Sequence, residues 1–196
     1  MWIVKLGGSL HDTPALRRWL RWLATAPGPA RIVVPGGGPF ADTVRTLQPK
    51  LGFGELAAHR MAILAMQQYG LVLQALEPAL CLAETDAELK ARRAAIWLPW
   101  QLAGQEGAIE PSWDVTSDSL ACWLAIRLAA TDLLLVKSAP VPAGARGAAQ
   151  LAASGLVDMA FAGFARTYPG AIHVAHRDAP LGKLLAAPAN ACRVTG

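Results

Sequence analysis

Two units of the same kind follow one another at the start of the chain, each a short strand, a glycine turn and a helix. In the first unit, bulky and β-branched residues predict a strand over 2–6, a glycine pair follows, and apolar residues recur at helical spacing over 14–23. In the second, a strand over 31–35 is followed by three glycines and by a helix over 39–47 that begins with proline. Strands that alternate with helices predict an α/β fold with an open, mostly parallel sheet and helices on both faces.

The rest of the chain continues this alternation. Further helices are predicted over 55–76, 84–90, 119–130, 148–153, 157–164 and 180–185, and further strands over 94–99, 132–137, 171–175 and 192–195. No linker divides these elements, and the two glycine units are the only internal repeat in the sequence. We therefore expect residues 1–196 to form a single domain.

The composition indicates a chain with much buried surface. Apolar residues make up 54% of the 196 residues and charged ones 16%, which predicts a large core and contact between subunits of a homo-oligomer. No apolar run reaches the roughly 18–20 residues of a membrane span, and the early Lys5 is not typical of a signal peptide. Cys81, Cys122 and Cys192 are widely spaced, which favours free thiols in a reducing cytoplasm.

The charge pattern favours a small anionic ligand over nucleic acid. The net charge is +4, carried by thirteen arginines and five lysines. These side chains are scattered in ones and twos, whereas a nucleic-acid surface usually gathers them into a patch with aromatic residues between.

The first glycine turn has the features of a phosphate site. Gly7 and Gly8 have no side chain to keep another group away from the backbone, and a strand–turn–helix unit leaves free N–H groups that point into one space. Ser9 either caps a helix or hydrogen-bonds a ligand oxygen. Lys5 adds a positive charge at the lip of the turn. The alternative is a glycine turn that binds nothing, since the spacing is neither that of a Walker loop nor Gly-x-Gly-x-x-Gly.

Polar residues gather at the start of the helix predicted over 119–130. Ser117 or Asp118 would serve as its N-cap, but the hydroxyl and carboxylate residues of this short segment are more than a cap requires. His59, near the start of the helix over 55–76, either packs in the core or faces the ligand space.

Three motifs in this order resemble the amino-acid kinase superfamily: Lys-Leu-Gly-Gly-Ser at 5–9, Pro-Gly-Gly-Gly at 35–38 and Thr-Ser-Asp-Ser at 116–119. Residues 35–42 and the helix from Ala58 to Gly70 are most similar to the short branch of methanofuran biosynthesis. The kinase of that branch converts an aminomethyl-furanylmethyl phosphate to the diphosphate. The resemblance covers residues 1–137 well and the remainder loosely.

The resemblance implies roles for individual residues. Lys5 would neutralise the transferring phosphoryl group, and Asp118 would orient the catalytic lysine. The nucleotide phosphates of ATP, with Mg²⁺, would be held by Gly7, Gly8, Ser9, Lys137 and Ser138, with no metal site built by the protein. The phosphate of the acceptor would approach Gly36, Gly37 and Gly38, and further acceptor ligands would be Asp42, His59 and Thr116. Asp42 suits an aminomethyl ammonium group.

The C-terminal half departs from the family pattern. Residues 136–141 read Val-Lys-Ser-Ala-Pro-Val where the family usually has Thr-Asp-Val-Asp-Gly or a similar motif, and no lysine lies between Lys137 and Lys183. Either Lys137 or Arg166 then takes the place of the family's second lysine. The resemblance thus implies an acceptor-binding N-terminal half and a reduced nucleotide-binding C-terminal half.

The sequence therefore predicts an ATP-dependent kinase of a small phosphorylated acceptor, of the aminomethyl-furanylmethyl phosphate type used for a one-carbon carrier. The alternatives are a kinase of another small acceptor, such as an amino acid, UMP or an isoprenoid phosphate, and a non-catalytic ligand-binding or scaffold protein that retains the fold.

Overall fold

The computed structural model describes residues 1–142, 147–181 and 192–194. Within these residues, seven strands form one sheet in the order β3-β4-β2-β1-β5-β6-β7. All neighbouring strands are parallel except β7, which runs antiparallel to β6. The strands are β1 (Trp2–Leu6), β2 (Arg31–Pro35), β3 (Cys81–Ala83), β4 (Ala94–Trp97), β5 (Asp132–Lys137), β6 (Ala171–His176) and β7 (Cys192–Val194). The predicted open, mostly parallel α/β sheet is confirmed.

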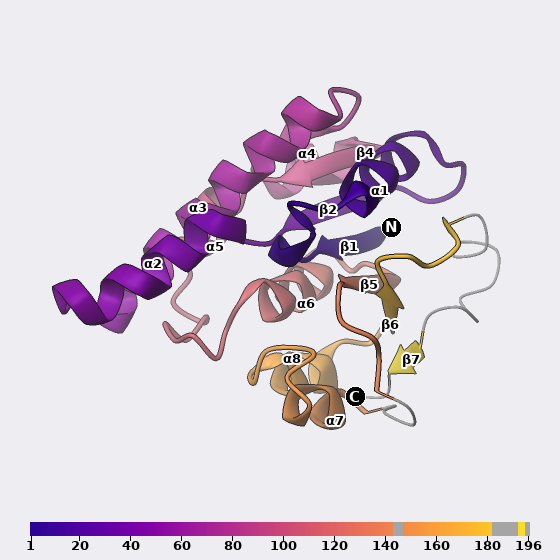
Figure 1. Cartoon of the computed structure of the whole chain (residues 1–196). Helices are drawn as coiled ribbons and strands as arrows, with labels where there is room; N and C mark the ends of the chain where they lie inside the picture. Colours follow the sequence, from indigo (N-terminus) through magenta and orange to yellow (C-terminus); the bar gives the residue numbers. More distant parts are fainter. Residues whose placement is uncertain (143–146, 182–191, 195–196) are drawn as a thin grey trace.

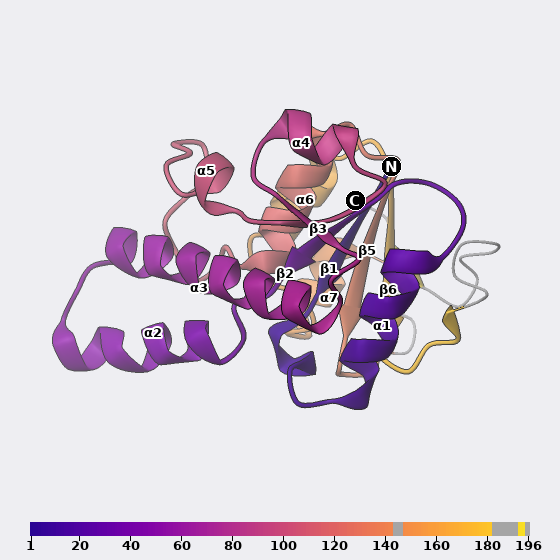
Figure 2. The ribbon, with the colours of Figure 1, turned by 90° about the horizontal axis from the view of Figure 1, so that it is seen from above.

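Helices cover both faces of this sheet (Figures 1 and 2). Their bounds are η1 (Gly8–Leu10, a 3-10 turn), α1 (Pro14–Thr25), α2 (Gly38–Leu51), α3 (Glu55–Leu76), α4 (Asp86–Ala91), α5 (Trp100–Ala103), α6 (Ser117–Arg127), α7 (Ala148–Ala153) and α8 (Phe161–Thr167). Apolar residues of α1 and of the second half of α3 pack on one face, whereas α6, α7 and α8 pack on the other. The two central strands, β1 and β5, are therefore buried from both sides.

The pleat of the central strands decides which side chains reach α6. In β1, Val4 and Leu6 belong to the apolar cluster on the α1 side, whereas Ile3 packs on the α6 side. Since side chains alternate along a strand, Lys5 points to the same side as Ile3, towards α6. The same alternation in β5 places Lys137 on the α6 side, two residues after the buried Leu135.

The structure differs from the sequence prediction in a few elements. The short strand β3 and the single turn α5 were not predicted, because each is too brief to show a periodic pattern. Helix α6 begins at Ser117, two residues before the predicted start. In the helix predicted over 180–185, residues 182–185 lie outside the described residues, and the strand predicted over 192–195 is confirmed for 192–194.

Helices α2 and α3 form an antiparallel hairpin that extends beyond the edge of the sheet (Figure 2). Helix α2 was predicted to end at Leu47 but continues to Leu51 with Pro49 in its last turn. A proline there costs a single backbone hydrogen bond, and Gly52, with a φ of 71°, ends the helix in the left-handed conformation that glycine adopts without strain.

Two of the three predicted free thiols lie in the described side chains. Cys81 is exposed and Cys122 is buried in α6, and neither is in a disulfide. The side chain of Cys192 lies outside the described part of the chain. Among the described helices, none combines the length and the apolar character that crossing a membrane requires.

Candidate active site

Three buried charged side chains meet at the N-terminal end of α6. Lys5 from β1 and Lys137 from β5 both approach Asp118 in the first turn of α6. Lys5 Nζ lies 3.0 Å from Asp118 Oδ1, and Lys137 Nζ donates to Asp118 Oδ2 at 2.6 Å. Their exposed fractions are only 5%, 4% and 9% for Lys5, Asp118 and Lys137. We call these residues the charge triad.

The charge triad has a net positive charge that favours binding of an anion. Burial works against the charge on Asp118, but Lys5 and Lys137 outweigh burial and hold its pKa below the usual value. Burial and the repulsion of Lys5 lower the pKa of Lys137 to about 8, against the attraction of Asp118 and Asp158. Two ammonium groups facing one carboxylate leave a net positive charge in a dry place, where a negatively charged phosphoryl group is stabilised most strongly.

The triad corrects one expectation, and its geometry favours one of the two candidates for a second lysine. Lys5 was expected at the lip of the glycine turn, but the central position of β1 buries its side chain under α6. Of the two candidates for a second lysine, Lys137 contacts Asp118, whereas Arg166 lies exposed on α8. Asp118 is not the N-cap of its helix, and neither is Ser117, because Thr116 occupies that position.

Asp158, which the sequence analysis did not single out, holds the N-terminus of α6. Its carboxylate accepts hydrogen bonds from the backbone N–H and hydroxyl of Thr116 and from the backbone N–H and hydroxyl of Ser119. No local pattern could have identified this residue, since Asp158 lies some forty positions away, between α7 and α8.

The two glycine turns lie directly against each other. A Cβ atom on Gly8 would lie 2.5 Å from the backbone nitrogen of Gly38, and a Cβ atom on Gly36 would run into the nitrogen of Gly8. Gly38 also has a φ of 54°, which favours glycine. Within the described residues, the N–H groups of Gly8 and Ser9 have no acceptor, while those of Leu10 and His11 donate to turn carbonyls. The free amides remain available to a ligand oxygen.

A hydrogen bond joins the first turn to the end of β5. The hydroxyl of Ser9 lies 2.7 Å from that of Ser138, the residue after Lys137. His176, at the end of β6, contacts the carbonyl of Ser138 with its Nε2 at 3.0 Å. The predicted nucleotide residues Gly7, Gly8, Ser9, Lys137 and Ser138 are thus brought together at the carboxyl ends of β1 and β5, where ligands of open α/β sheets collect.

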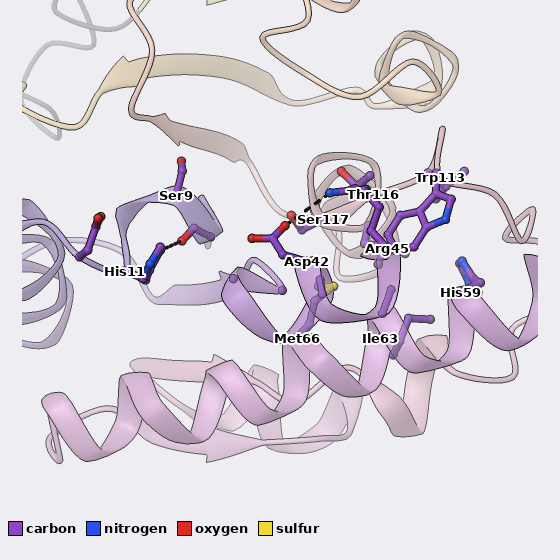
Figure 3. Close-up of a pocket in the computed structure, with 18 residues that line it drawn as sticks. Ser9, His11, Asp42, Arg45, His59, Ile63, Met66, Trp113, Thr116 and Ser117 are labelled. Atoms are coloured by element: carbon purple, nitrogen blue, oxygen red, sulfur yellow. Dashed lines mark hydrogen bonds and ion pairs between the residues drawn. The ribbon is translucent and has the colours of Figure 1, made fainter. Parts of the chain in front are cut away.

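A pocket of about 430 Å³ opens beside the glycine turns (Figure 3). Its wall includes Gly8 and Ser9 from the first turn, and Ser117, the neighbour of Asp118. Apolar side chains form part of the lining, namely Ala41, Ala62, Ile63, Met66, Val115 and Leu120. Figure 3 shows Ser9 and His11 at one end of the pocket. The pocket therefore connects the phosphate-type turn with a partly apolar chamber.

The opposite end of the pocket has a polar cluster that the sequence analysis missed. The Arg45 guanidinium lies over the ring of Trp113 at 4.3 Å from its centroid, beside His59 in Figure 3. Trp113 Nε1 donates to Gln48 Oε1 at 2.5 Å, which ties the loop before α6 to helix α2. Arg45 and Gln48 lie one turn apart on α2, but no sequence pattern indicated that Trp113 reaches them.

All of the predicted acceptor residues except Gly36 line this pocket. Asp42 lies between its two ends and pairs with Arg45 at 3.5 Å. His59 is buried, and burial together with the Arg60 charge lowers its pKa, so the imidazole is neutral at pH 7. The hydroxyl of Thr116 is committed as a donor to Asp158. Gly37 and Gly38 also line the pocket, whereas Gly36 is buried and does not.

Comparison with known proteins gives a consistent result. Residues 1–140 match the model of the amino acid kinase family. The chain is 32% identical over 128 residues to [5-(aminomethyl)furan-3-yl]methyl phosphate kinase of Methanocaldococcus jannaschii, a match that covers 63% of this chain and 59% of that relative. The chain thus matches less than two thirds of that relative's length.

Solved structures share the fold at low identity. Uridylate kinase from Archaeoglobus fulgidus superposes with a TM-score of 0.70 at 17% identity, covering 99% of this chain and 98% of the other. UMP kinase from Bacillus anthracis gives 0.71 at 17% identity, covering 99% and 95%. With the family model matched over residues 1–140, the chain belongs to the amino acid kinase family.

Proposed function

We propose that this chain is a kinase that transfers the γ-phosphoryl group of ATP to the phosphate of a small acceptor. The observation that carries the proposal is the charge triad of Lys5, Asp118 and Lys137, which lies buried next to two abutting glycine turns. Phosphoryl transfer needs alignment and charge neutralisation more than covalent chemistry, and this site offers both. Family membership and the resemblance to a phosphate kinase support the same reaction.

ATP supplies the phosphoryl group, and the accompanying Mg²⁺ neutralises part of the phosphate charge. The site residues fit such an anion, since the amides of Gly8 and Ser9 are free and the triad is net positive. In the described part of the chain, no three His, Cys, Asp or Glu side chains gather as a metal site. Mg²⁺ held by substrate phosphates and water does not depend on such a cage.

The residues of the chain then have separable tasks. An oxygen of the acceptor's phosphate forms the new bond to the γ-phosphorus while the bond to the bridging oxygen of ADP breaks. Because an acceptor phosphate is already ionised, no general base is needed. Lys5 and Lys137 stabilise the charge on the transferring group, and Asp118 keeps both ammonium groups in place.

We propose an aminomethyl-furanylmethyl phosphate as the acceptor. The phosphate would lie against Gly37 and Gly38, facing the nucleotide phosphates at Gly8 and Ser9, and the ring would pack on the apolar side chains of Ile63 and Met66. Asp42 lies between the two ends of the pocket and would pair with the ammonium group. The 32% identity to a kinase of this compound supports the choice.

The test is an assay of ADP release with ATP, Mg²⁺ and a panel of acceptors: the aminomethyl-furanylmethyl phosphate, UMP, aspartate and isopentenyl phosphate. The furan compound is expected to have the highest kcat/KM. Asp42→Asn is expected to raise its KM roughly tenfold with little change in kcat, because a charge-assisted contact to an ammonium is lost.

The control is the same ring without its amino group, for which Asp42→Asn should change nothing. Turnover of another acceptor only would replace the proposed substrate. No turnover of any acceptor, together with an unchanged melting temperature in millimolar Mg·ATP, would favour a scaffold protein, since a ligand that binds the folded state raises its stability.

We also propose that copies of this chain assemble through the α2–α3 hairpin. Large apolar side chains are exposed there, namely Phe40, Leu47, Leu51, Leu56, Leu64, Leu71 and Val72. An exposed apolar patch of this kind is typical of an interface. Light scattering after size-exclusion chromatography should give a multiple of the 20.6 kDa chain mass, and Leu64→Glu/Leu71→Glu should give the monomer. A wild-type monomer would contradict this assembly, as would Leu64→Glu/Leu71→Glu remaining oligomeric.

A further inference from the structure

Asp158 belongs to the C-terminal half of the chain, yet its contacts are with the segment that leads into the charge triad. One carboxylate oxygen accepts from the backbone N–H of Thr116 at 2.9 Å, from its hydroxyl at 2.8 Å and from the backbone N–H of Ser119 at 3.0 Å. The other oxygen accepts from the hydroxyl of Ser119. A single distant side chain thus supplies the acceptors that an N-cap residue normally provides.

The residues that Asp158 contacts lie on both sides of Asp118 in the sequence. Thr116 is the N-cap of α6 and Ser119 its third residue, so Asp118 lies between the two anchored positions. A second link adds to the first, since the N–H of Ala160 donates to the carbonyl of Asp114 at 3.0 Å. The segment 158–160 is therefore fastened to the segment 114–119 at two places.

We propose that Asp158 is a positioning residue of the phosphoryl-transfer site, which fixes the first turn of α6 so that Asp118 holds Lys5 and Lys137 in register. A carboxylate that only capped the N-terminus of a helix would stabilise the fold without affecting the reaction. Asp158 differs because the turn it fixes contains the triad carboxylate and also forms part of the pocket wall, through Thr116 and Ser117. The inference rests on the proposed kinase function, but not on the choice of acceptor.

The charge of Asp158 has a second consequence. The charged groups that act on Lys137 are Lys5 from β1, Asp118 from α6 and Asp158 from the α7–α8 segment. Burial and Lys5 lower the pKa of Lys137, whereas Asp118 and Asp158 raise it, with the result near 8. Removal of the Asp158 charge therefore lowers the pKa of Lys137 further. A neutral Lys137 can no longer stabilise a phosphoryl group, so activity is lost at a lower pH.

The kinetic test compares Asp158→Asn with the wild-type enzyme. Asparagine keeps one acceptor oxygen but loses the charge, and its amide nitrogen cannot accept from the donors of the other oxygen. We expect kcat to fall at least tenfold with a smaller change in the KM for ATP. In the wild type, kcat/KM should decline as the pH rises through about 8, where Lys137 loses its proton, and in Asp158→Asn this decline should begin at lower pH.

A second readout does not depend on turnover. In protein labelled with ¹³C-lysine, the side-chain resonance of Lys137, assigned by its loss in Lys137→Met, should titrate at lower pH in Asp158→Asn than in the wild type. Thr116→Val/Ser119→Ala removes both hydroxyl donors but keeps the carboxylate. It should lower kcat and leave the decline at high pH in place. The matched control is Asp86→Asn, which removes a surface partner of Arg127 at the far end of α6.

The outcomes separate two failures. If no acceptor is turned over but the Lys137 resonance shifts as expected, the proposed reaction fails and the link between Asp158 and the triad remains. If folded Asp158→Asn has a kcat within twofold of the wild type and an unshifted Lys137 titration, the positioning role is overturned. Should Asp158→Asn not fold, a wild-type kcat in Thr116→Val/Ser119→Ala would overturn it equally.

Discussion

Asp118→Asn is expected to lower kcat by about a hundredfold or more, in line with the loss of a preorganised electrostatic group. Asparagine would serve nearly as well as aspartate if residue 118 only capped α6. The structure excludes that role, because Thr116 is the N-cap and Asp158 satisfies its donors. The carboxylate of Asp118 instead contacts Lys5 with one oxygen and Lys137 with the other, whereas a neutral amide has one acceptor oxygen and no charge to balance the two ammonium groups.

The same substitution should also reduce stability. Removal of one partner from a buried ion pair costs about 3–5 kcal/mol, because a charge is left buried without its counterpart. The difference in the free energy of unfolding between Asp118→Asn and the wild type should shrink as the pH rises. Lys137 has a pKa of about 8 in the folded protein and 10.5 as its ordinary value, so the unfolded chain binds more protons in this window and stability rises with pH. Because Asp118 raises the pKa of Lys137, this pKa is lower in Asp118→Asn, and the pH range over which stability rises begins at lower pH.

Urea denaturation at pH 7 and pH 9.5, beside steady-state kinetics, measures both effects. Asp86→Asn is again the control, since its partially exposed pair with Arg127 is expected to contribute at most about 1 kcal/mol and has no link to turnover. Turnover of Asp118→Asn within threefold of the wild type would remove the carboxylate from the mechanism.

Much of the fold follows from patterns that are local in the sequence. Strand and helix periods are visible over a few residues, and the order of strands and helices predicts a parallel sheet. The alternation of side chains along β1 and β5 also predicts that Lys5 and Lys137 share one face of the sheet. Each lies two residues from an apolar side chain that packs on the α6 face. The expected exposure of Lys5 was wrong because strand order is not a local property, and β1 proved to lie in the middle of the sheet.

The contacts that complete the site are long-range, and local patterns carry no sign of them. Asp158 reaches Thr116 and Ser119 across the chain, and Trp113 reaches Gln48 and Arg45 from a different segment. Asp158 and Trp113 are single side chains in loops, where no periodic pattern indicates which way a side chain points. The sequence predicts the residues that the resemblance names, but not those that hold them in place.

Lys5→Met and Lys137→Met are each expected to lower kcat by roughly a hundredfold or more, since each removes a fixed positive charge next to the transferring group. Methionine is unbranched, only one heavy atom shorter than lysine and suited to a buried site, so both variants should fold with one ion pair to Asp118 intact. Lys5→Met/Lys137→Met should cost less than the two losses added, because both lysines act on the same group through one carboxylate. Lys90→Met, on the exposed side of α4, is the matched control.

The pH profile distinguishes this role of Lys5 from a purely structural one. The positive charge of Lys5 is one of the causes that lower the pKa of Lys137 to about 8. In Lys5→Met that repulsion is gone, so Lys137 keeps its proton to higher pH and the residual kcat/KM should decline later than in the wild type. The shift is opposite to that expected for Asp158→Asn, which no general loosening of the site would produce. Near-wild-type turnover in Lys5→Met, or a decline at lower pH, would contradict the paired action of the two lysines.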